Sequence, residues 1–317
     1  MGGAVIPKIA TRIYGELMHN LLKSTFLVCK NHDFVSFNVF RWAFKIYFCG
    51  GTCLGALKSH DLFDILAMQL DDECVNVGPF RFVFIPKLLP SLVAQCDDIL
   101  AESVLSHKLG DYYRLFGKEG PYEVEEVSLN EKDFVIDAGA NMGVFSVYAA
   151  SRGVAKVYAF EPVKQLFSIL SKNITVNNYQ DQIEIIPIGL SNRNGLQTIS
   201  FSEDALDGAS LVFHEQQLTE AVPCMTLDDW VKENNIPRID FIKADIEGAE
   251  RYLLSGAQET LKKFKPRLAI CTYHLPDDPQ VLERLIKEAV PEYRVIQRSK
   301  KLFAYVPDEM KKNERSR

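Results

Sequence analysis

No two cysteines in this sequence have the C-x-x-C spacing of a zinc site or a thiol redox motif. The seven cysteines are scattered along the chain and odd in number. This distribution argues against a disulfide framework and for reduced thiols. We therefore expect a cytoplasmic protein without a cysteine-bound metal.

Long hydrophobic runs are also absent. The most apolar stretch covers residues 46–57 and is flanked by Lys45 and Lys58. Twelve residues are too few to cross a bilayer as a helix, which needs about 20. The N-terminus shows no basic start followed by an apolar run and a cleavage site, so we expect no secretory signal.

The sequence has little positive charge overall, with a net charge of -6. A strongly basic surface is the usual mark of nucleic-acid binding, so we expect no nucleic-acid partner. The first 60 residues differ, because they hold seven Lys and Arg against two acids, which leaves -11 for the rest. Two interpretations of this basic, apolar region stay open: helices that pack on a catalytic domain, or a peripheral contact with a membrane or lipid.

The composition is that of a globular protein, with 317 residues of which 47% are hydrophobic and 25% charged. Such a chain holds one large or two modest domains. The most loop-like stretch is GKEGP at residues 117–121. We place a boundary there, between a largely helical region of residues 1–120 and a second domain of residues 121–317. Nothing in the sequence indicates the oligomeric state.

Residues 134–143, FVIDAGANMG, form the most informative stretch. A short apolar run ends in Asp137, and Gly139 and Gly143 follow before a pattern typical of a helix. Strand, glycine turn and helix together form the ligand-facing corner of a doubly wound α/β sheet. Glycines at such a turn let the backbone come close to a ligand, and the helix start attracts anionic groups.

The spacing of this turn separates two classes of cofactor. A dinucleotide fingerprint is G-x-G-x-x-G, and Asn141 stands where its middle glycine would be. Asp137 disfavours a pyrophosphate and suits the amino group and sulfonium of S-adenosylmethionine. The next predicted strand, residues 155–160, ends in Glu161, which can accept hydrogen bonds from both hydroxyls of a ribose.

Further polar residues follow other predicted strands. Asn192 comes after a third strand, where it faces an adenine or is merely part of a turn. Asp245 and Glu247 follow a strand that starts at residue 239, and His274 ends a fifth strand. Ligands of open α/β sheets bind at the carboxyl ends of the strands, so we expect these side chains along one edge. Tyr122 and Glu123, just before the first strand, are expected to form one wall of the cofactor site.

Two other segments have a local prediction. Residues 204–210 form a polar, glycine-containing loop that we expect to cover an acceptor site as a lid. A single helix is predicted after residue 248, with Leu254, Ala257, Leu261 and Phe264 on one face. Glu247 and Glu250 have an alternative role as acids in its first turn, where acids are favoured, and for Glu250 we prefer it.

The chain resembles the FkbM family of S-adenosylmethionine-dependent methyltransferases. The resemblance rests on residues 136–143, 159–162, 226–229 and 239–250, and it covers about residues 122–305. It implies a seven-stranded, mostly parallel, Rossmann-like class I fold with a reversed final hairpin. It also implies O-methylation of a sugar, glycan or natural product. The family usually has a bulkier aliphatic residue at position 138.

The residues expected to bind S-adenosylmethionine are then Tyr122, Glu123, Asp137, Gly139, Asn141, Gly143, Glu161, Asn192 and Asp245. An alcohol is a weak nucleophile at neutral pH, so a group must take its proton. His274 is the first candidate for this base, although it can equally be a polar residue that starts a loop. Asp245 is the second, as base or as the residue that orients His274. A Mg²⁺ ion held by Asp245 and Glu247 is another possibility.

Two other classes of protein compete with this interpretation. A nicotinamide-dependent oxidoreductase would use the same sheet edge, but the glycine spacing and Asp137 disfavour it. A non-catalytic Rossmann-like scaffold is disfavoured by acids at so many strand ends. Methylation of protein or nucleic acid is disfavoured by the acidic catalytic half and by the absence of an N-P-P-Y-type tetrapeptide after the fourth strand.

Overall fold

The computed structural model describes residues 121–202, 205–213 and 218–307, together with parts of residues 74–99. The chain divides into two compact units, Met1–Asn76 and Val77–Arg317. Most of residues 1–120 lie outside the described residues. The helical character of that region and the boundary near residue 120 therefore stay predictions.

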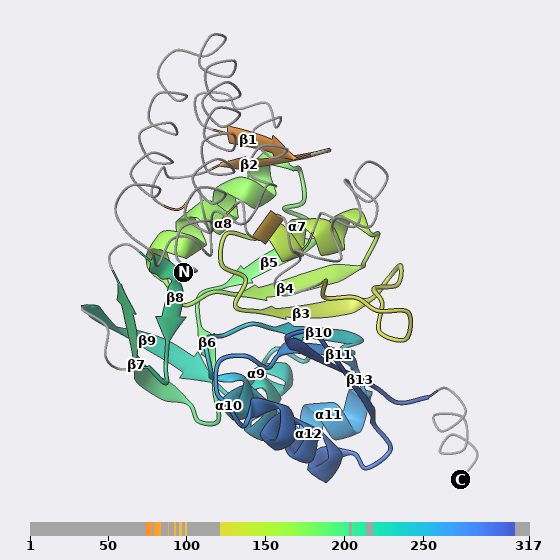
Figure 1. Ribbon diagram of the computed structural model, residues 1–317. Coiled ribbons are helices and arrows are strands. Elements are labelled where there is room, and N and C mark those ends of the chain that lie inside the picture. The colour runs from red at the N-terminus through yellow and green to blue at the C-terminus, as the bar shows by residue number, and fades with distance from the viewer. Residues whose placement is uncertain are drawn as a thin grey trace, which may run out of the picture. The chain divides into compact units, whose positions relative to one another are not determined.

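A seven-stranded sheet forms the centre of the second unit, in the order β12-β13-β11-β10-β3-β4-β5 (Figure 1). Its strands are β3 (Phe134–Ala138), β4 (Lys156–Phe160), β5 (Ile183–Ile186), β10 (Phe241–Ala244), β11 (Arg267–Cys271), β12 (Arg294–Arg298) and β13 (Lys301–Tyr305). β3 pairs in parallel with β4 and β10, whereas β13 runs antiparallel to both of its neighbours. The predicted mostly parallel sheet with a reversed final hairpin is confirmed.

Helices cover both faces of this sheet (Figure 1). They are α7 (Val144–Ser151), α8 (Lys164–Val176), α9 (Leu227–Glu233), α10 (Glu250–Ser255), α11 (Gln258–Phe264) and α12 (Asp278–Ala289). α7 and α8 contact the β3–β5 half, and α9 to α12 contact one another on the opposite face. Ile136 and Ala138 on β3 belong to the core on the α9–α12 side. Because side chains alternate along a strand, Asp137 between them points to the α7 side.

A second, four-stranded sheet follows β5, in the order β6-β9-β7-β8. Its strands are β6 (Gly189–Leu190), β7 (Gly195–Ser202), β8 (Ala205–Ser210) and β9 (Leu218–Met225). The prediction of a loop at residues 204–210 is wrong, since β8 pairs with β7 in an antiparallel hairpin. β8 lies at the edge of this sheet, where a strand is held by its backbone bonds and needs no apolar pattern.

The single helix predicted to carry Leu254, Ala257, Leu261 and Phe264 is two helices, α10 and α11. Gly256 ends α10, and a Cβ atom there would overlap the Ser191 carbonyl oxygen. The Asp228 carboxylate accepts hydrogen bonds from the Glu259 and Thr260 amides at the start of α11. Asp228 belongs to α9, so the cap at the start of α11 comes from another helix. The local apolar pattern of residues 250–264 does not indicate such a cap.

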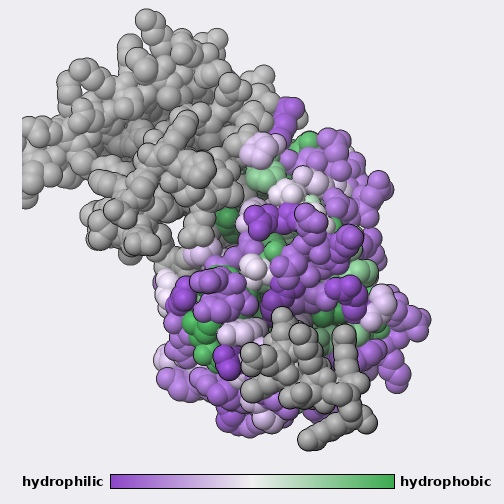
Figure 2. All heavy atoms as spheres, turned by 90° about the vertical axis from the view of Figure 1, so that its right-hand side faces the viewer, coloured by the Kyte–Doolittle hydropathy of each residue, from purple (hydrophilic) through white to green (hydrophobic). Residues whose placement is uncertain are grey.

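Two short strands precede the main sheet, β1 (Cys74–Val77) and β2 (Phe80–Val83). β2 falls within the strand predicted for residues 80–85. Among the described residues, no helix is long and apolar enough to cross a membrane. On the face drawn in Figure 2, the described part is mainly hydrophilic, with small apolar areas between the polar side chains.

Candidate functional site

The turn after β3 brings the backbone against the next strand of the sheet. Gly139, Asn141 and Gly143 all have positive φ, at 74°, 53° and 88°. A Cβ atom at Gly139 would overlap the carbonyl oxygen of Asp245, so only glycine fits at this close approach. The turn and the end of β10 are therefore in close contact, as expected if both lie at one edge of the sheet.

Asp137 is fully buried beneath this turn. One of its carboxylate oxygens accepts a 2.6 Å hydrogen bond from the Ser146 hydroxyl, and the other lies 3.0 Å from Lys243 Nζ. Lys243 also donates to the Gly139 carbonyl oxygen at 2.7 Å. Oδ1, although ion-paired with Lys243, makes no hydrogen bond, and Asp137 does not line the pocket described below, so its direct contact with a cofactor stays a prediction. Asp137 and Lys243 together fix the turn from below.

Glu161 faces the turn from the end of β4. Its two carboxylate oxygens accept hydrogen bonds from the backbone amides of Asn141, at 2.8 Å, and Val163, at 2.9 Å. Burial raises the pKa of Glu161 to about 7, although these two amides lower it. The side-chain oxygen of Asn141 is also buried and has no hydrogen-bond partner. Glu161 and Asn141 therefore have acceptor lone pairs to which no described residue donates a hydrogen bond.

A pocket opens between this edge of the main sheet and the second sheet. The space between its lining residues is about 570 Å³, counting the part open to solvent. Gly139, Asn141, Glu161, Asp245 and Glu247 supply its polar wall. Its apolar wall comes from residues such as Phe160, Leu166, Ile188, Ile199 and Leu211. Four of the predicted cofactor residues, Gly139, Asn141, Glu161 and Asp245, thus line one pocket.

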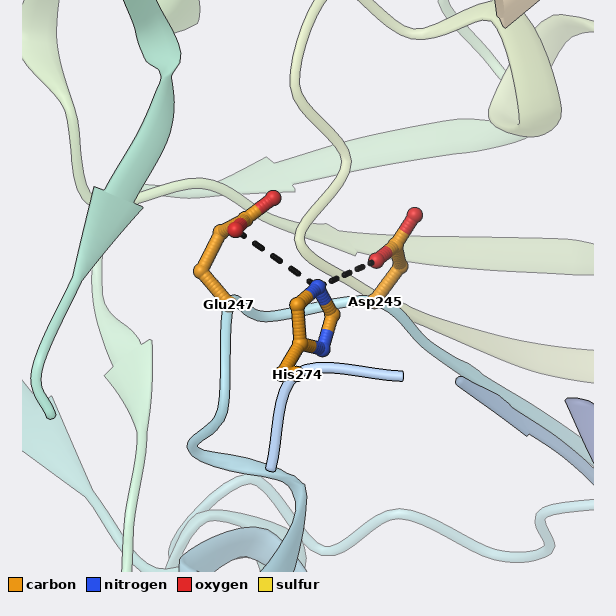
Figure 3. A group of neighbouring side chains, drawn as sticks. All are labelled: Asp245, Glu247 and His274. Atoms are coloured by element: carbon orange, nitrogen blue, oxygen red, sulfur yellow. Dashed lines mark ion pairs between the residues drawn. The ribbon is translucent and has the colours of Figure 1, made fainter. Parts of the chain in front are cut away.

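Asp245, Glu247 and His274 meet beside this pocket (Figure 3). His274 Nε2 lies 3.7 Å from a carboxylate oxygen of Asp245 and 3.5 Å from one of Glu247. The two acids follow β10 and the histidine follows β11, so the parallel pairing of these strands brings them together. Glu247 has a positive φ of 52°, an uncommon conformation for a residue other than glycine that turns its side chain toward the group.

The charges and the burial of this cluster shift the pKa values of its side chains. Burial lowers the pKa of His274, but the carboxylates of Glu247 and Glu250 outweigh burial and raise the pKa to about 11. Burial raises the pKa of Glu247. Burial also raises that of Asp245, but Lys243 and His274 bring the net pKa below its usual value. A protonated imidazole at neutral pH cannot accept a proton, which counts against His274 as a base in this arrangement.

Glu250 is more than an acid in the first turn of a helix. Its carboxylate is fully buried, accepts a 2.9 Å hydrogen bond from the Ile246 amide and lies 3.0 Å from His274 Nδ1. The first-turn position in α10 is as predicted, but the side chain points inward and orients the histidine. The spacing of Glu247 and Glu250 places them on different sides of His274.

Three other predicted cofactor residues lie away from the pocket wall. Tyr122 is buried and its hydroxyl donates a 2.6 Å hydrogen bond to Asp245. Glu123 accepts hydrogen bonds from the Leu129 amide and the Tyr148 hydroxyl. Asn192 lines a separate hollow on the second sheet.

Gly143, at the start of α7, does not line the pocket and lies against the side chain of Leu170 in α8. Tyr122 thus supports the site from behind, and Gly143 shapes its turn. The hollow lined by Asn192 shares Leu211 with the pocket, and cofactor contacts of Glu123 and Asn192 stay predictions.

Lys243 is the residue of the site that the sequence analysis missed. It is a buried lysine within the otherwise apolar strand FIKA, and the strand register places it beside Asp137. A lysine inside an apolar strand must have a buried partner, so its position was a usable signal.

Comparison with known proteins connects this site to a family. The methyltransferase FkbM domain matches residues 137–301, more than half of the 317 residues. Methyltransferase sdnD of Sordaria araneosa is 28% identical over 42% of this chain and 63% of its own length. Hexuronic acid methyltransferase AglP of Haloferax volcanii is 27% identical over 56% of this chain and 73% of its own. The 2-O-methyltransferase NoeI of Sinorhizobium fredii is 28% identical over 43% of this chain and 63% of its own.

The matched part of the chain spans about two thirds of these relatives. The family match begins at Asp137 and contains the glycine turn, Glu161, Lys243 and the Asp245–His274 cluster. With the class I strand order of the main sheet, it shows that the chain belongs to the FkbM methyltransferase family.

Proposed function

We propose that this domain transfers a methyl group from S-adenosylmethionine to a hydroxyl of a small-molecule or glycan acceptor. The observation that carries the proposal is one pocket whose wall holds Glu161 and Asn141 together with Asp245 and Glu247. Glu161 and Asn141 offer acceptors for a nucleoside, and Asp245 and Glu247 offer carboxylates for a proton. Alignment of the two substrates supplies most of the rate enhancement in such a displacement.

The pocket residues suit the cofactor that the family uses. Glu161 is held by two backbone amides with lone pairs left for the ribose hydroxyls. The unpaired Asn141 side-chain oxygen, buried in the same wall, would accept from a hydroxyl or amino donor. When bound, S-adenosylmethionine supplies a methyl group on a sulfonium, which leaves as S-adenosylhomocysteine. Asp137 and Gly143 act behind the turn in this proposal.

In this proposal the acceptor hydroxyl approaches beside Asp245 and Glu247. Its oxygen forms the new bond to the methyl carbon as the carbon–sulfur bond breaks, and its proton leaves to a carboxylate of the cluster or to solvent. Of the predicted catalytic pair, Asp245 keeps a place in the pocket wall. His274 lies behind it, where it holds the two carboxylates in position.

The acceptor class follows from the relatives and the pocket. The names of two relatives specify a hexuronic acid and a 2-O position as their targets. The first name gives a sugar acid and the second an oxygen position, and a hydroxyl acceptor suits a pocket whose wall presents carboxylates. A cytoplasmic location, the role of residues 1–120 and a peripheral membrane contact remain parts of the proposal that rest on the sequence alone.

Calorimetry with S-adenosylmethionine tests the cofactor site, and radiolabelled methyl transfer into glycan, lipid and small-molecule fractions tests the acceptor class. NAD is the comparison ligand, because an oxidoreductase would bind it in the same pocket. Glu288→Gln, an exposed change on α12, is the matched control for Glu161→Gln. Tight binding of NAD without S-adenosylmethionine would overturn the proposal.

A further inference from the structure

Neither ring nitrogen of His274, a buried residue near the pocket, has a hydrogen-bond partner, and each lies at ion-pair distance from carboxylates. The side chain of His274 is only 4% exposed, yet Nε2 makes no hydrogen bond. It points between the carboxylates of Asp245 and Glu247 (Figure 3). One ligand atom from each of the three residues lies within 4.8 Å of the others. A buried imidazole nitrogen aimed at two carboxylates is the donor set of a divalent cation.

We propose that Asp245, Glu247 and His274 bind a zinc-class divalent cation, which takes the place of the proton on His274 Nε2, with a fourth position open to the pocket. Three protein ligands and one open position are the pattern of catalytic zinc sites. Structural zinc sites are instead closed by four protein ligands.

The imidazole ligand favours zinc over magnesium, and the two distances from it are compatible with zinc. Bonds of about 2.1 Å at tetrahedral angles place two ligand atoms about 3.4 Å apart. The distances from Nε2 to the two carboxylates, 3.5 and 3.7 Å, are close to that value. An octahedral magnesium site needs about 3.0 Å and prefers oxygen ligands alone. The Mg²⁺ ion considered from the sequence for Asp245 and Glu247 is thus the less suitable occupant.

The residues behind the three ligands hold them as metal sites require. Metal-bound histidines usually direct their other ring nitrogen to a carboxylate, and Glu250 lies 3.0 Å from His274 Nδ1. Tyr122 donates to one oxygen of Asp245 at 2.6 Å, and the other oxygen, which accepts from the Tyr273 hydroxyl at 3.3 Å, lies toward His274. Glu250 and Tyr122 are positioning residues in this proposal.

The site is reachable from the pocket. Side chains of Asp245 and Glu247 are 23% and 31% exposed, and both line the pocket wall. A hydroxyl that coordinates the open position loses its proton more readily. This role in activating the acceptor rests on the proposed methyl transfer, whereas binding of the ion does not.

Calorimetric titration of the chelator-treated full chain with ZnCl₂ tests the site, and MgCl₂ is the comparison. We expect one Zn²⁺ per chain, at least tenfold weaker Mg²⁺ binding, and at least tenfold weaker Zn²⁺ binding in His274→Gln and Glu247→Gln. Glu250→Gln should weaken Zn²⁺ binding by about 10- to 100-fold. Glu288→Gln should bind like the wild type, and circular dichroism confirms that each variant is folded.

Absence of saturable Zn²⁺ binding by the wild type would overturn the proposal. Equal Zn²⁺ affinity of the wild type and of folded His274→Gln would also overturn it, because the ion would then be bound elsewhere, for example by one of the seven cysteines. Binding of S-adenosylmethionine is measured separately in the presence of chelator. Cofactor binding without Zn²⁺ binding removes the metal site alone. If the wild type binds Zn²⁺, His274→Gln does not, and the wild type fails to bind S-adenosylmethionine, the metal site is supported and the proposed function is removed.

Discussion

Lys243 Nζ lies 3.0 Å from a carboxylate oxygen of Asp137, and both side chains are buried in the centre of the sheet. The acid that ends β3 is therefore neutralised within the protein by the strand beside it. The same ammonium donates to the Gly139 carbonyl oxygen and so joins β10 to the glycine turn. Removal of one charge from such a pair leaves the other buried and unpaired.

Lys243→Met should lower the free energy of unfolding by about 3–5 kcal/mol, because Asp137 loses its counter-charge. Urea unfolding of the cofactor-free protein measures this loss. The double variant Lys243→Met, Asp137→Asn should recover part of it, since no unpaired charge remains. Lys287→Met, at a half-exposed ion pair on α12, is the control. A loss below about 1 kcal/mol, the range of exposed pairs, would show that the buried pair is not a support of the turn.

Gly139→Ala should destabilise the protein more than Gly195→Ala does. Both glycines have positive φ, 74° and 118°, so alanine is strained at either position by about 1–3 kcal/mol. Only at Gly139 would the added Cβ overlap a backbone atom, the Asp245 carbonyl oxygen, whereas nothing lies within 4 Å of the Cβ at Gly195. Thermal unfolding of the two variants isolates the overlap. Equal losses would mean that the turn and β10 are not in close contact.

Asn141→Gly should weaken binding of S-adenosylmethionine about tenfold, which corresponds to about 1.4 kcal/mol, while the fold keeps its stability. Glycine accepts the φ of 53° without strain, and the change removes a buried oxygen that has no partner. Calorimetry measures affinity, and urea unfolding measures stability. Unchanged affinity would place the cofactor away from Asn141.

Glu161 should make the cofactor-free protein less stable as pH rises. Its pKa is about 7 in the folded protein, above the usual 4.5, so the folded state binds the proton more tightly. This contribution is fully present below about pH 4.5 and is lost as pH rises through 7. At 1.36 kcal/mol per pKa unit, it amounts to about 3 kcal/mol. Urea unfolding between pH 5 and 8 should show this decline in the wild type and lack it in Glu161→Gln. Parallel pH profiles would rule out a raised pKa.

The sheet and its ligand edge were predictable because they follow from local patterns. Each parallel strand is a short apolar run, and Glu161, Asp245 and His274 each stand at or near the end of one. Parallel pairing places those ends together, so the sequence alone predicted one edge. The glycines at 139 and 143 likewise showed a turn that needs positive φ.

Contacts between distant segments were not predictable in this way. The ion pair of Asp137 with Lys243, the cap of α11 by Asp228 and the contact of Glu250 with His274 join residues that local periodicity cannot relate. β8 was missed for a similar reason, since an edge strand is held by its partner and not by its own pattern. Those tertiary contacts decide which acids face the pocket and which support it.

Calorimetric binding of S-adenosylmethionine to the wild type and to Glu161→Ala tests the central claim most directly. The account predicts one molecule per chain for the wild type and at least tenfold weaker binding for the variant, because Glu161 would pair with the ribose hydroxyls. Equal binding by the two proteins, with both folded, would contradict the account and leave the pocket without a cofactor.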